Sequence, residues 1–248
     1  MRIKRFMAPE QLSEVEGQLQ RLIDEAVPTL EPPAVMFQCE GDASSLRQMN
    51  GVGGLYRRAF SDDYFHQLVF GPGSLFVRLA AMLLGGPIRT DLKFEGTWLD
   101  KLPARDGCLR SPATPPHQDA AYSQGENAAT HKVLDFWLPF QHTTRDNGGL
   151  IYCGGSHRYG LCPHHRPGVL GFSKGIADDD LERYQKRFGG DTVQVDAERG
   201  DLICHHAFVI HRSAANRTPD RNRRSLGGAI VSTVPWPVPE WTNAEPRL

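Results

Sequence analysis

The stretch LICHHAFVI at residues 202–210 decides the fold class of this chain, and the turn residues RGD at 199–201 come directly before it. Branched and aromatic apolar residues that follow turn residues in this way are typical of a β-strand. We expect one strand over 202–210 that ends at His211. Further short strands are expected on both sides, at residues 92–98, 136–140, 192–195 and 226–231. Turn residues separate these runs, for example DNGG at 146–149 and GGS at 154–156.

Helical patterns occupy the first third of the chain. Between Pro9 and Ala26, apolar residues recur at spacings of three and four, which predicts an amphipathic helix. Two further helices are expected at residues 61–70 and 74–85, because each stretch begins with residues that cap helices. One later helix is expected at Asp178–Phe188. We therefore predict an all-β core with helices (α+β), namely a double-stranded β-helix of the jelly-roll, cupin-like type with N-terminal helices packed on one sheet. A single domain is expected over 1–248, mainly helical in 1–89 and jelly roll in 90–235.

The composition is that of an ordinary globular protein with many turns. Of 248 residues, 25 are glycine and 18 are proline, and the formal net charge of −1 gives no electrostatic basis for binding nucleic acid or an anionic membrane. No apolar stretch is long enough for a membrane span or a secretory signal, and the longest candidate, at 75–84, contains Arg78. Five cysteines without a CxxC pair predict neither a disulfide framework nor a thiolate zinc site. We expect a cytoplasmic protein with a small-molecule partner, and the sequence leaves its oligomeric state open.

Three residues form a candidate metal site. His117 and Asp119 lie two apart in a segment that we expect to enter a strand, where alternate side chains project from the same face. One His-x-Asp pair carries little weight, because chance alone supplies about one in a chain of this composition. His211 provides a second imidazole, and two histidines with one carboxylate are the donor set that leaves open positions on iron(II) for substrate and dioxygen.

A series of motifs in a fixed order strengthens this interpretation and carries a family resemblance. From residue 83 to 231 the chain resembles the phytanoyl-CoA dioxygenase family of iron(II)/2-oxoglutarate oxygenases. The segments that carry the resemblance are LLGGP at 83–87, HQD at 117–119, WLPF at 137–140, DNGGL at 146–150, GGSHR at 154–158, GD at 200–201, His206, HRSAAN at 211–216 and the basic pair at 223–224.

The resemblance implies a set of roles for individual residues. His117, Asp119 and His211 fall on the iron(II) ligands, and Arg223, with Ser213 as an accessory hydroxyl, falls on the group that binds the distal carboxylate of 2-oxoglutarate. Lys101, which comes before Leu102-Pro103, resembles a family lysine that also reaches this cosubstrate. Dioxygen would be the second cosubstrate.

The anchoring arginine has two competitors. The chain carries a one-residue insertion before it relative to the family, so Arg221 or Arg224 could take the role instead. Neighbours on a strand face opposite sides, and only Arg223 shares its face with small residues, which leave room for a ligand. These small residues are Ser225, Gly227 and Ala229.

Residues around the centre receive lesser roles. Tyr122 and Gln118 are the candidates for contact with substrate, and no catalytic residue is expected beyond the metal centre. His205 and His206 are interpreted as structural, with His206 a candidate donor to a metal ligand. Residues 37–55 are expected to line the mouth of the barrel.

The leading hypothesis is an iron(II)/2-oxoglutarate dioxygenase that hydroxylates a C–H bond of a small or medium-sized soluble metabolite and releases succinate and CO2. Asp119 stands where halogenases of this fold carry a small residue, which favours hydroxylation or another oxidation. Two alternatives remain open at this point. One is a cupin-type metal-dependent lyase, isomerase or hydrolase that does not use 2-oxoglutarate, and the other is a catalytically silent metal-binding member of the fold.

Overall fold

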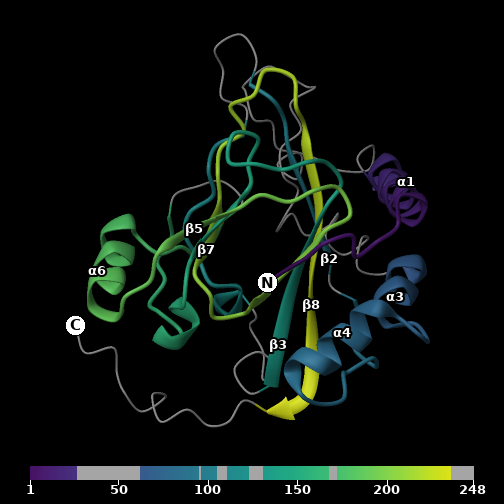
Figure 1. Ribbon diagram of the computed structural model, residues 1–248, viewed down its shortest axis with the longest axis horizontal. Coiled ribbons are helices and arrows are strands. Elements are labelled where there is room, and N and C mark those ends of the chain that lie inside the picture. The colour runs from purple at the N-terminus through teal and green to yellow at the C-terminus, as the bar shows by residue number, and fades with distance from the viewer. Residues whose placement is uncertain (27–61, 95, 105–110, 123–130, 168–171, 236–248) are drawn as a thin grey trace.

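Two antiparallel sheets form the centre of the computed structural model, which describes residues 1–26, 62–94, 96–104, 111–122, 131–167 and 172–235 (Figure 1). The larger sheet has the order β1-β6-β3-β8-β2, and the smaller has the order β5-β4-β7. The larger sheet consists of β1 (Arg2–Ile3), β2 (Gly96–Lys101), β3 (His131–Pro139), β6 (Leu202–His206) and β8 (Arg223–Pro235). The smaller consists of β4 (Leu150–Cys153), β5 (Thr192–Val195) and β7 (His211–Ser213).

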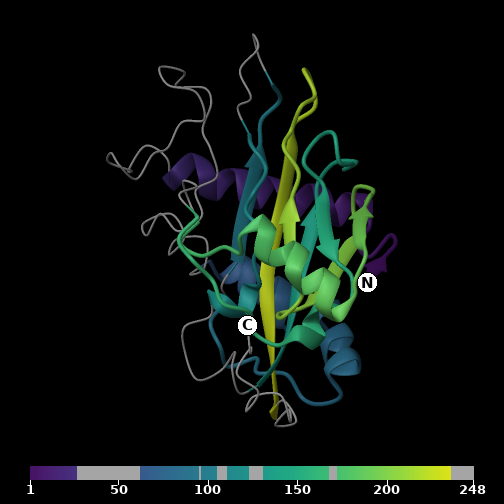
Figure 2. The same ribbon diagram turned by 90° about the vertical axis from the view of Figure 1, so that its left-hand side faces the viewer.

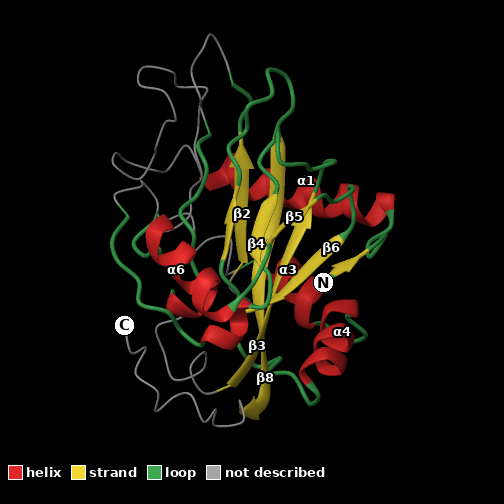
Figure 3. Cartoon of the chain, turned by 60° about the vertical axis from the view of Figure 1, so that its left-hand side comes forward, coloured by secondary structure: helices red, strands yellow, loops and turns green. Residues whose placement is uncertain are grey.

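The helices lie outside the two sheets. Helices α1 (Pro9–Ala26), α3 (Asp63–Phe70) and α4 (Leu75–Leu84) lie on the side of the larger sheet, and α6 (Asp178–Phe188) lies on the side of the smaller one (Figure 1). Figure 2 shows α6 in front of the strands and α1 behind them, and Figure 3 shows the strands enclosed between the helices. This is the predicted arrangement, in which N-terminal helices cover one sheet of a jelly roll.

Local sequence signals explain where the helices begin and end. Asp62 accepts hydrogen bonds from the backbone N–H groups at the start of α3, and Ser74 does the same for α4. Gly85 has the left-handed conformation (φ 71°) that commonly ends a helix, so α4 stops there. Helices α1 and α6 have the predicted bounds, Pro9–Ala26 and Asp178–Phe188.

Alternation along the strands separates two cores and leaves room for a site between the sheets. In β3, Phe136 and Leu138 pack into the cluster formed with the N-terminal helices, whereas Trp137 packs against Leu150 and Tyr152 of the smaller sheet. The space between the sheets is therefore lined by the inward-facing residues of both.

The strand predicted over 202–210 is wrong in its second half. Strand β6 ends at His206, the chain turns at residues 207–210, and His211 begins β7 in the other sheet. The expected start of a strand at residue 92 is also wrong, because β2 begins at Gly96. The expected mouth at 37–55 lies outside the described residues.

In the described part of the chain, no single helix is long and apolar enough to span a membrane. Only α3 and α4 together, as a pair bent by 47°, meet the length and composition criteria.

A buried carboxylate fastens the N-terminal strand to the turn before β6. Asp201, which is 1% exposed, accepts hydrogen bonds from the backbone N–H of Arg5 (2.9 Å) and of Glu198 (2.9 Å) and from Nε of Arg2 (2.7 Å). Burial opposes its ionised form, but these three donors together lower the pKa of Asp201 below its usual value. Its contribution to stability is therefore complete above the unfolded-state pKa of about 4 and is lost as the pH falls through the lower, folded-state value.

Asp201→Asn is expected to lower the free energy of unfolding at pH 7 by about 1–3 kcal/mol, because a neutral amide satisfies these donors poorly. The difference from the unchanged protein should shrink as the pH falls below about 4. Urea unfolding across this pH range measures both effects, with Asp191→Asn at an exposed position as the matched control. Equal stability of the Asp201→Asn protein and the unchanged protein at pH 7 would contradict the assigned role.

Candidate metal centre and its pocket

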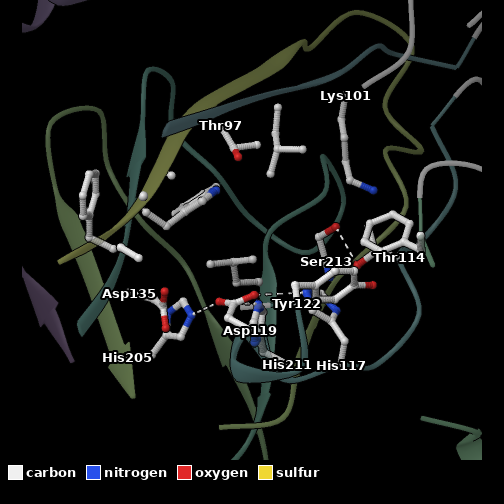
Figure 4. A pocket seen from close by; sticks show the side chains of 18 of the residues that line it. Thr97, Lys101, Thr114, His117, Asp119, Tyr122, Asp135, His205, His211 and Ser213 are labelled. Atoms are coloured by element: carbon white, nitrogen blue, oxygen red, sulfur yellow. Dashed lines mark hydrogen bonds and ion pairs between the residues drawn. The ribbon is translucent and has the colours of Figure 1, made fainter. Parts of the chain in front are cut away.

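A cavity of about 270 Å³ lies between the two sheets and contains nearly all the polar residues singled out in the sequence. Figure 4 shows Asp119 between His205 on one side and His117 and His211 on the other, with Lys101 at the far edge. The larger sheet contributes Lys101, Asp135, His205 and Arg223, and the smaller sheet contributes His211 and Ser213.

His117, Asp119 and His211 come together as a group that could hold a metal ion. Each offers one ligand atom, and these atoms lie within 4.8 Å of one another. Nε2 of His117 is 3.5 Å from Oδ1 of Asp119, and Nε2 of His211 is 3.7 Å from Oδ2 of Asp119. All three side chains line the cavity and lie next to one another (Figure 4).

Backbone carbonyl groups fix the orientation of both imidazoles. Nδ1 of His117 is 2.9 Å from the carbonyl oxygen of Pro115, and Nδ1 of His211 is 3.2 Å from that of Val209. A carbonyl oxygen only accepts hydrogen bonds, so each Nδ1 carries the proton and each Nε2 presents its lone pair to the cavity. This arrangement is typical of histidines that bind metals.

The backbone explains how residues far apart in the chain meet here. His117 and His211 form a bridge in which each N–H donates to the carbonyl of the other residue (3.0 and 2.9 Å). Asp119 does not continue a strand, as the sequence suggested, but begins a short 3-10 helix, Asp119–Ala121. The two side chains still face the same cavity because Gln118 between them is extended (φ −117°, ψ 133°).

The charges of the three groups suit a divalent cation. Burial lowers the pKa of His211 to about 3, so its ring is neutral at pH 7. Burial opposes the ionisation of Asp119, but the surrounding His211, His117 and His205 lower the pKa of Asp119 well below its usual value. Neutral imidazole together with a carboxylate is the donor set found in mononuclear iron(II) oxygenases.

Arg223 is a buried cation in the same cavity. It is 1% exposed, and its Nη1 donates to Oγ of Ser225 (2.7 Å) and to the carbonyl of Leu99 (3.2 Å). Its guanidinium carbon lies 5.5 Å from the ring centroid of Trp137. Burial lowers the pKa of Arg223 to about 10, which still leaves it charged at neutral pH.

The neighbouring arginines point elsewhere. Arg224 faces the N-terminal helices, where it forms a two-pronged ion pair with Asp100 (2.8 and 2.7 Å) and a hydrogen bond to Gln20 of α1 (2.6 Å). Arg221 is exposed and does not line the cavity. Strand β8 thus places only Arg223 on the cavity side, together with the small residues Gly227 and Ala229.

Lys101 and Ser213 also lie in the cavity. Lys101 is opposite Arg223 in the sheet, is 6% exposed, and donates from Nζ to the carbonyl of Pro112 (2.6 Å). A Cβ on Gly148 would come within 2.5 Å of the Lys101 side chain, which explains a glycine in this turn. The hydroxyl of Ser213 is 3.2 Å from that of Thr114, another residue of the cavity wall.

The two residues expected to contact substrate differ in position. Tyr122 lines the cavity, with its ring edge against His117 at a centroid distance of 5.6 Å, and its hydroxyl contacts the backbone of Lys174. Gln118 is fully buried away from the cavity, where its side chain bonds Gly160, Phe208 and Cys162. Gln118 therefore connects its own segment to the segments at 160–162 and 207–210, and it is not among the residues that line the cavity.

Two residues of the site were not expected from the sequence. His205, interpreted as structural, lines the cavity and places Nε2 2.9 Å from Oδ2 of Asp119, while its Nδ1 is 3.1 Å from the hydroxyl of Tyr152. Asp135 lies opposite His205 in the sheet and also lines the cavity. Burial and the nearby Asp119 raise the pKa of Asp135 well above its usual value. An acidic residue inside the apolar run VLDFWLPF at 133–140 was the signal available in the sequence.

Unsatisfied polar atoms gather in this cavity. Four buried side-chain atoms lack a hydrogen-bond partner in the described part of the chain, and three of them belong to residues of the cavity wall. They are Nε of Arg223, Nε1 of Trp137 and Oδ2 of Asp135. Buried polar groups in folded proteins are nearly always hydrogen-bonded, so such a concentration points to a missing polar ligand.

Comparison with known sequences places this geometry in a family context. The chain is 33% identical over 140 residues to a probable phytanoyl-CoA dioxygenase of Caenorhabditis elegans, a match that covers 55% of this chain and 41% of that protein. It is 32% identical over 108 residues to the peroxisomal phytanoyl-CoA dioxygenase of Homo sapiens, covering 42% of this chain and 29% of that protein. These matches span less than half of the relatives' length.

Solved structures share the fold at low sequence identity. The epimerase SnoN, solved in complex with Fe3+, alpha ketoglutarate and nogalamycin RO, superposes with a TM-score of 0.62 at 18% identity and covers 94% of this chain and 78% of its own. EctD from S. alaskensis with bound Fe superposes with a TM-score of 0.63 at 15% identity, covering 94% and 72%. These likenesses confirm the predicted jelly roll. The sequence model of the family Phytanoyl-CoA dioxygenase (PhyH) matches residues 1–225, and the chain therefore belongs to the phytanoyl-CoA dioxygenase family.

Proposed function

We propose that the protein is an iron(II)/2-oxoglutarate-dependent dioxygenase that oxidises a C–H bond of a small or medium-sized soluble metabolite. The observation that carries the proposal is one cavity that holds the His117, Asp119 and His211 group together with a buried arginine whose Nε has no partner among the described residues. Family membership and the iron and alpha ketoglutarate bound by a structural neighbour support it.

The residues of the cavity fit both groups. His117, Asp119 and His211 would hold iron(II), with both Nε2 atoms already turned toward the cavity by backbone carbonyls. Arg223 would bind the distal carboxylate of 2-oxoglutarate, because a guanidinium can donate two parallel hydrogen bonds to a carboxylate, and Ser213 and Lys101 would assist it. When bound, iron with 2-oxoglutarate and dioxygen supplies the oxidising power, and the cosubstrate ends as succinate and CO2.

The protein's own side chains prepare the centre for this chemistry. His205, with Nε2 2.9 Å from Oδ2 of Asp119, holds the carboxylate in one orientation. The hydroxyl of Tyr122 contacts the backbone of Lys174, and burial raises the pKa of Tyr122 to about 12, so its hydroxyl stays neutral beside the centre. Trp137 and Leu150 pack together and contribute apolar surface to the cavity wall.

Two alternative functions on the same fold account less well for the residues of the cavity. A cupin-type lyase, isomerase or hydrolase would have no use for the buried Arg223, and a silent protein would not be expected to keep all three ligand types. Two structural neighbours are named as an epimerase and a carbocyclase, so proteins of this fold carry out other reactions as well. Hydroxylation is the outcome that we propose first. A single domain over 1–248, a cytoplasmic location and the absence of a nucleic-acid partner stay predictions.

Anaerobic addition of 2-oxoglutarate to the iron(II)-loaded protein is expected to produce the weak visible charge-transfer band of a chelated keto acid. Exposure to air should then yield succinate. Succinate added in place of 2-oxoglutarate is the matched control, because it lacks the keto oxygen and should give no band. Absence of both the band and succinate formation would favour the lyase, isomerase or hydrolase alternative.

A further inference from the structure

The cavity has two ends of opposite charge on the same face of the larger sheet. Lys101 and Arg223 lie opposite each other at one end. Asp135 lies opposite Ala229, which is six residues further along β8, or about 20 Å of strand. The cation end suits the carboxylate of the cosubstrate, so the Asp135 end is left for another molecule.

One carboxylate oxygen of Asp135 is buried without a hydrogen-bond donor among the described residues. This oxygen is Oδ2, and Asp135 as a whole is 7% exposed. On one side its cross-strand neighbour is Ala229, which has no polar side-chain atom. On the other side is His205, whose two ring nitrogens already contact Asp119 and Tyr152.

Among the residues that the structure describes, the other buried carboxylate, Asp201, differs from Asp135 in its hydrogen bonds. Asp201 is also buried, and it receives three hydrogen bonds, from Arg2, Arg5 and Glu198. A buried carboxylate without donors destabilises a fold, and its place in a ligand cavity indicates a partner that arrives from outside. The ligand atoms of Asp119 and Asp135 lie within 4.8 Å of each other, and burial and Asp119 raise the pKa of Asp135. A cation beside Asp135 would therefore favour its ionised form, whereas a carboxylate or phosphate placed there would be repelled.

We propose that Asp135 selects the substrate by binding a protonated amine, so that the enzyme acts on a small cationic amine and rejects compounds that present a carboxylate or phosphate at this end of the cavity. This inference rests on the proposed function, since it assigns the Arg223 end to 2-oxoglutarate. Asp135 is thus a specificity-determining residue beside the centre, positioned on β3 two residues before Trp137.

The test compares three probes of equal length at pH 7, hexylammonium, hexanoate and 1-hexanol, by ligand-observed NMR titration. The unchanged protein is titrated both metal-free and with iron(II) and 2-oxoglutarate under anaerobic conditions. In the metal-free protein hexylammonium is compared with 1-hexanol, because Arg223 and Lys101 are then open to hexanoate. Hexylammonium should bind about tenfold or more tightly than hexanoate, because a desolvated charge-assisted hydrogen bond favours the cation. Asp135→Asn should remove this preference and leave binding of 1-hexanol unchanged.

Two further variants separate the charge of Asp135 from general effects. Asp135→Glu retains the carboxylate and should retain the preference for the cation, and Asp179→Asn, which removes an exposed charge on α6, should leave all three affinities unchanged. Equal binding of hexanoate and hexylammonium by the unchanged protein loaded with iron(II) and 2-oxoglutarate would overturn the proposal, and this comparison does not depend on the folding of any variant. A preference that persists in Asp135→Asn would overturn it as well.

Metal content distinguishes this proposal from its nearest rival. Asp119, Asp135 and His205 also form a group that could hold a metal ion, so two ions per chain in the unchanged protein and one in Asp135→Asn would replace the amine with a second metal. Binding of 2-oxoglutarate should be the same in Asp135→Asn as in the unchanged protein. Failure of both proteins to bind 2-oxoglutarate would reject the proposed function, whereas the preference for hexylammonium over 1-hexanol is measured independently in the metal-free protein.

Discussion

Replacing Asp119 by alanine is expected to remove iron from the purified protein and to abolish 2-oxoglutarate turnover. Asp119 is the only carboxylate in the His117, Asp119 and His211 group, so the variant would have to hold a divalent cation with two neutral imidazoles alone. Loss of a residue that merely supports a metal ligand costs about 10–100-fold in affinity, and loss of the ligand itself should cost more than about a hundredfold. Elemental analysis of the purified protein and succinate formation measure the two effects.

The matched control is a second carboxylate in the same cavity. Asp135→Asn removes a buried carboxylate that is not part of the proposed iron site, so this protein should retain its iron content. Full iron content and turnover in Asp119→Ala would show that the ligand set is wrong. Loss of iron in Asp135→Asn as well as in Asp119→Ala would place the metal on the group formed by Asp119, Asp135 and His205 instead.

Helices were predictable from the sequence because their signals are local. The apolar spacing in α1, the capping residues Asp62 and Ser74, and the terminal Gly85 each act within a few neighbouring residues. Strand bounds were less accessible. The run at 202–210 is apolar apart from His205 and His206, yet the chain leaves one sheet and enters the other inside it, because buried residues are needed on both sides of the turn.

The sequence correctly grouped His117 with Asp119, but the backbone conformation that brings their side chains together differs from the predicted one. Strand alternation was the expected cause for His117 and Asp119 facing the same way, whereas an extended Gln118 followed by a 3-10 turn is the observed one. The motif therefore carried more information than the predicted secondary structure. Asp135 and His205 could not be assigned to the site, because their contact depends on the register of β3 against β6, which no local pattern determines.

Strand alternation did place the arginines of β8 where they lie. The small residues that share a face with Arg223 favoured this face as the inner one, and Gly227 and Ala229 indeed line the cavity. Leu226 and Ile230, on the other face, pack in the core beneath the N-terminal helices. The geometry thus brings one arginine into the cavity, and its role there is testable.

Arg223→Ala is expected to weaken binding of 2-oxoglutarate about a hundredfold or more, which corresponds to about 2–4 kcal/mol for the loss of a buried, charge-assisted pair. Its Nε has no partner among the described residues, and Arg223 is the only one of the described arginines that lines the cavity. Arg223→Lys should bind nearly as poorly, because an ammonium cannot donate two parallel hydrogen bonds to one carboxylate. Anaerobic titration of the iron-loaded protein with 2-oxoglutarate measures these affinities.

Arg224→Ala and Arg221→Ala are the matched controls on the same stretch of chain. Arg224→Ala breaks the ion pair with Asp100 and should lower stability, but it should leave the affinity for 2-oxoglutarate unchanged, because Arg224 faces the helices. Arg221→Ala should change neither property, since its side chain is exposed. Normal affinity for 2-oxoglutarate in Arg223→Ala, with a large loss of affinity in either control, would identify that neighbour as the residue that binds the cosubstrate. Its side chain, and not that of Arg223, would then face the ligand. Three titrations with 2-oxoglutarate, in variants that differ only in the position of the lost guanidinium, thus identify the arginine that binds its carboxylate.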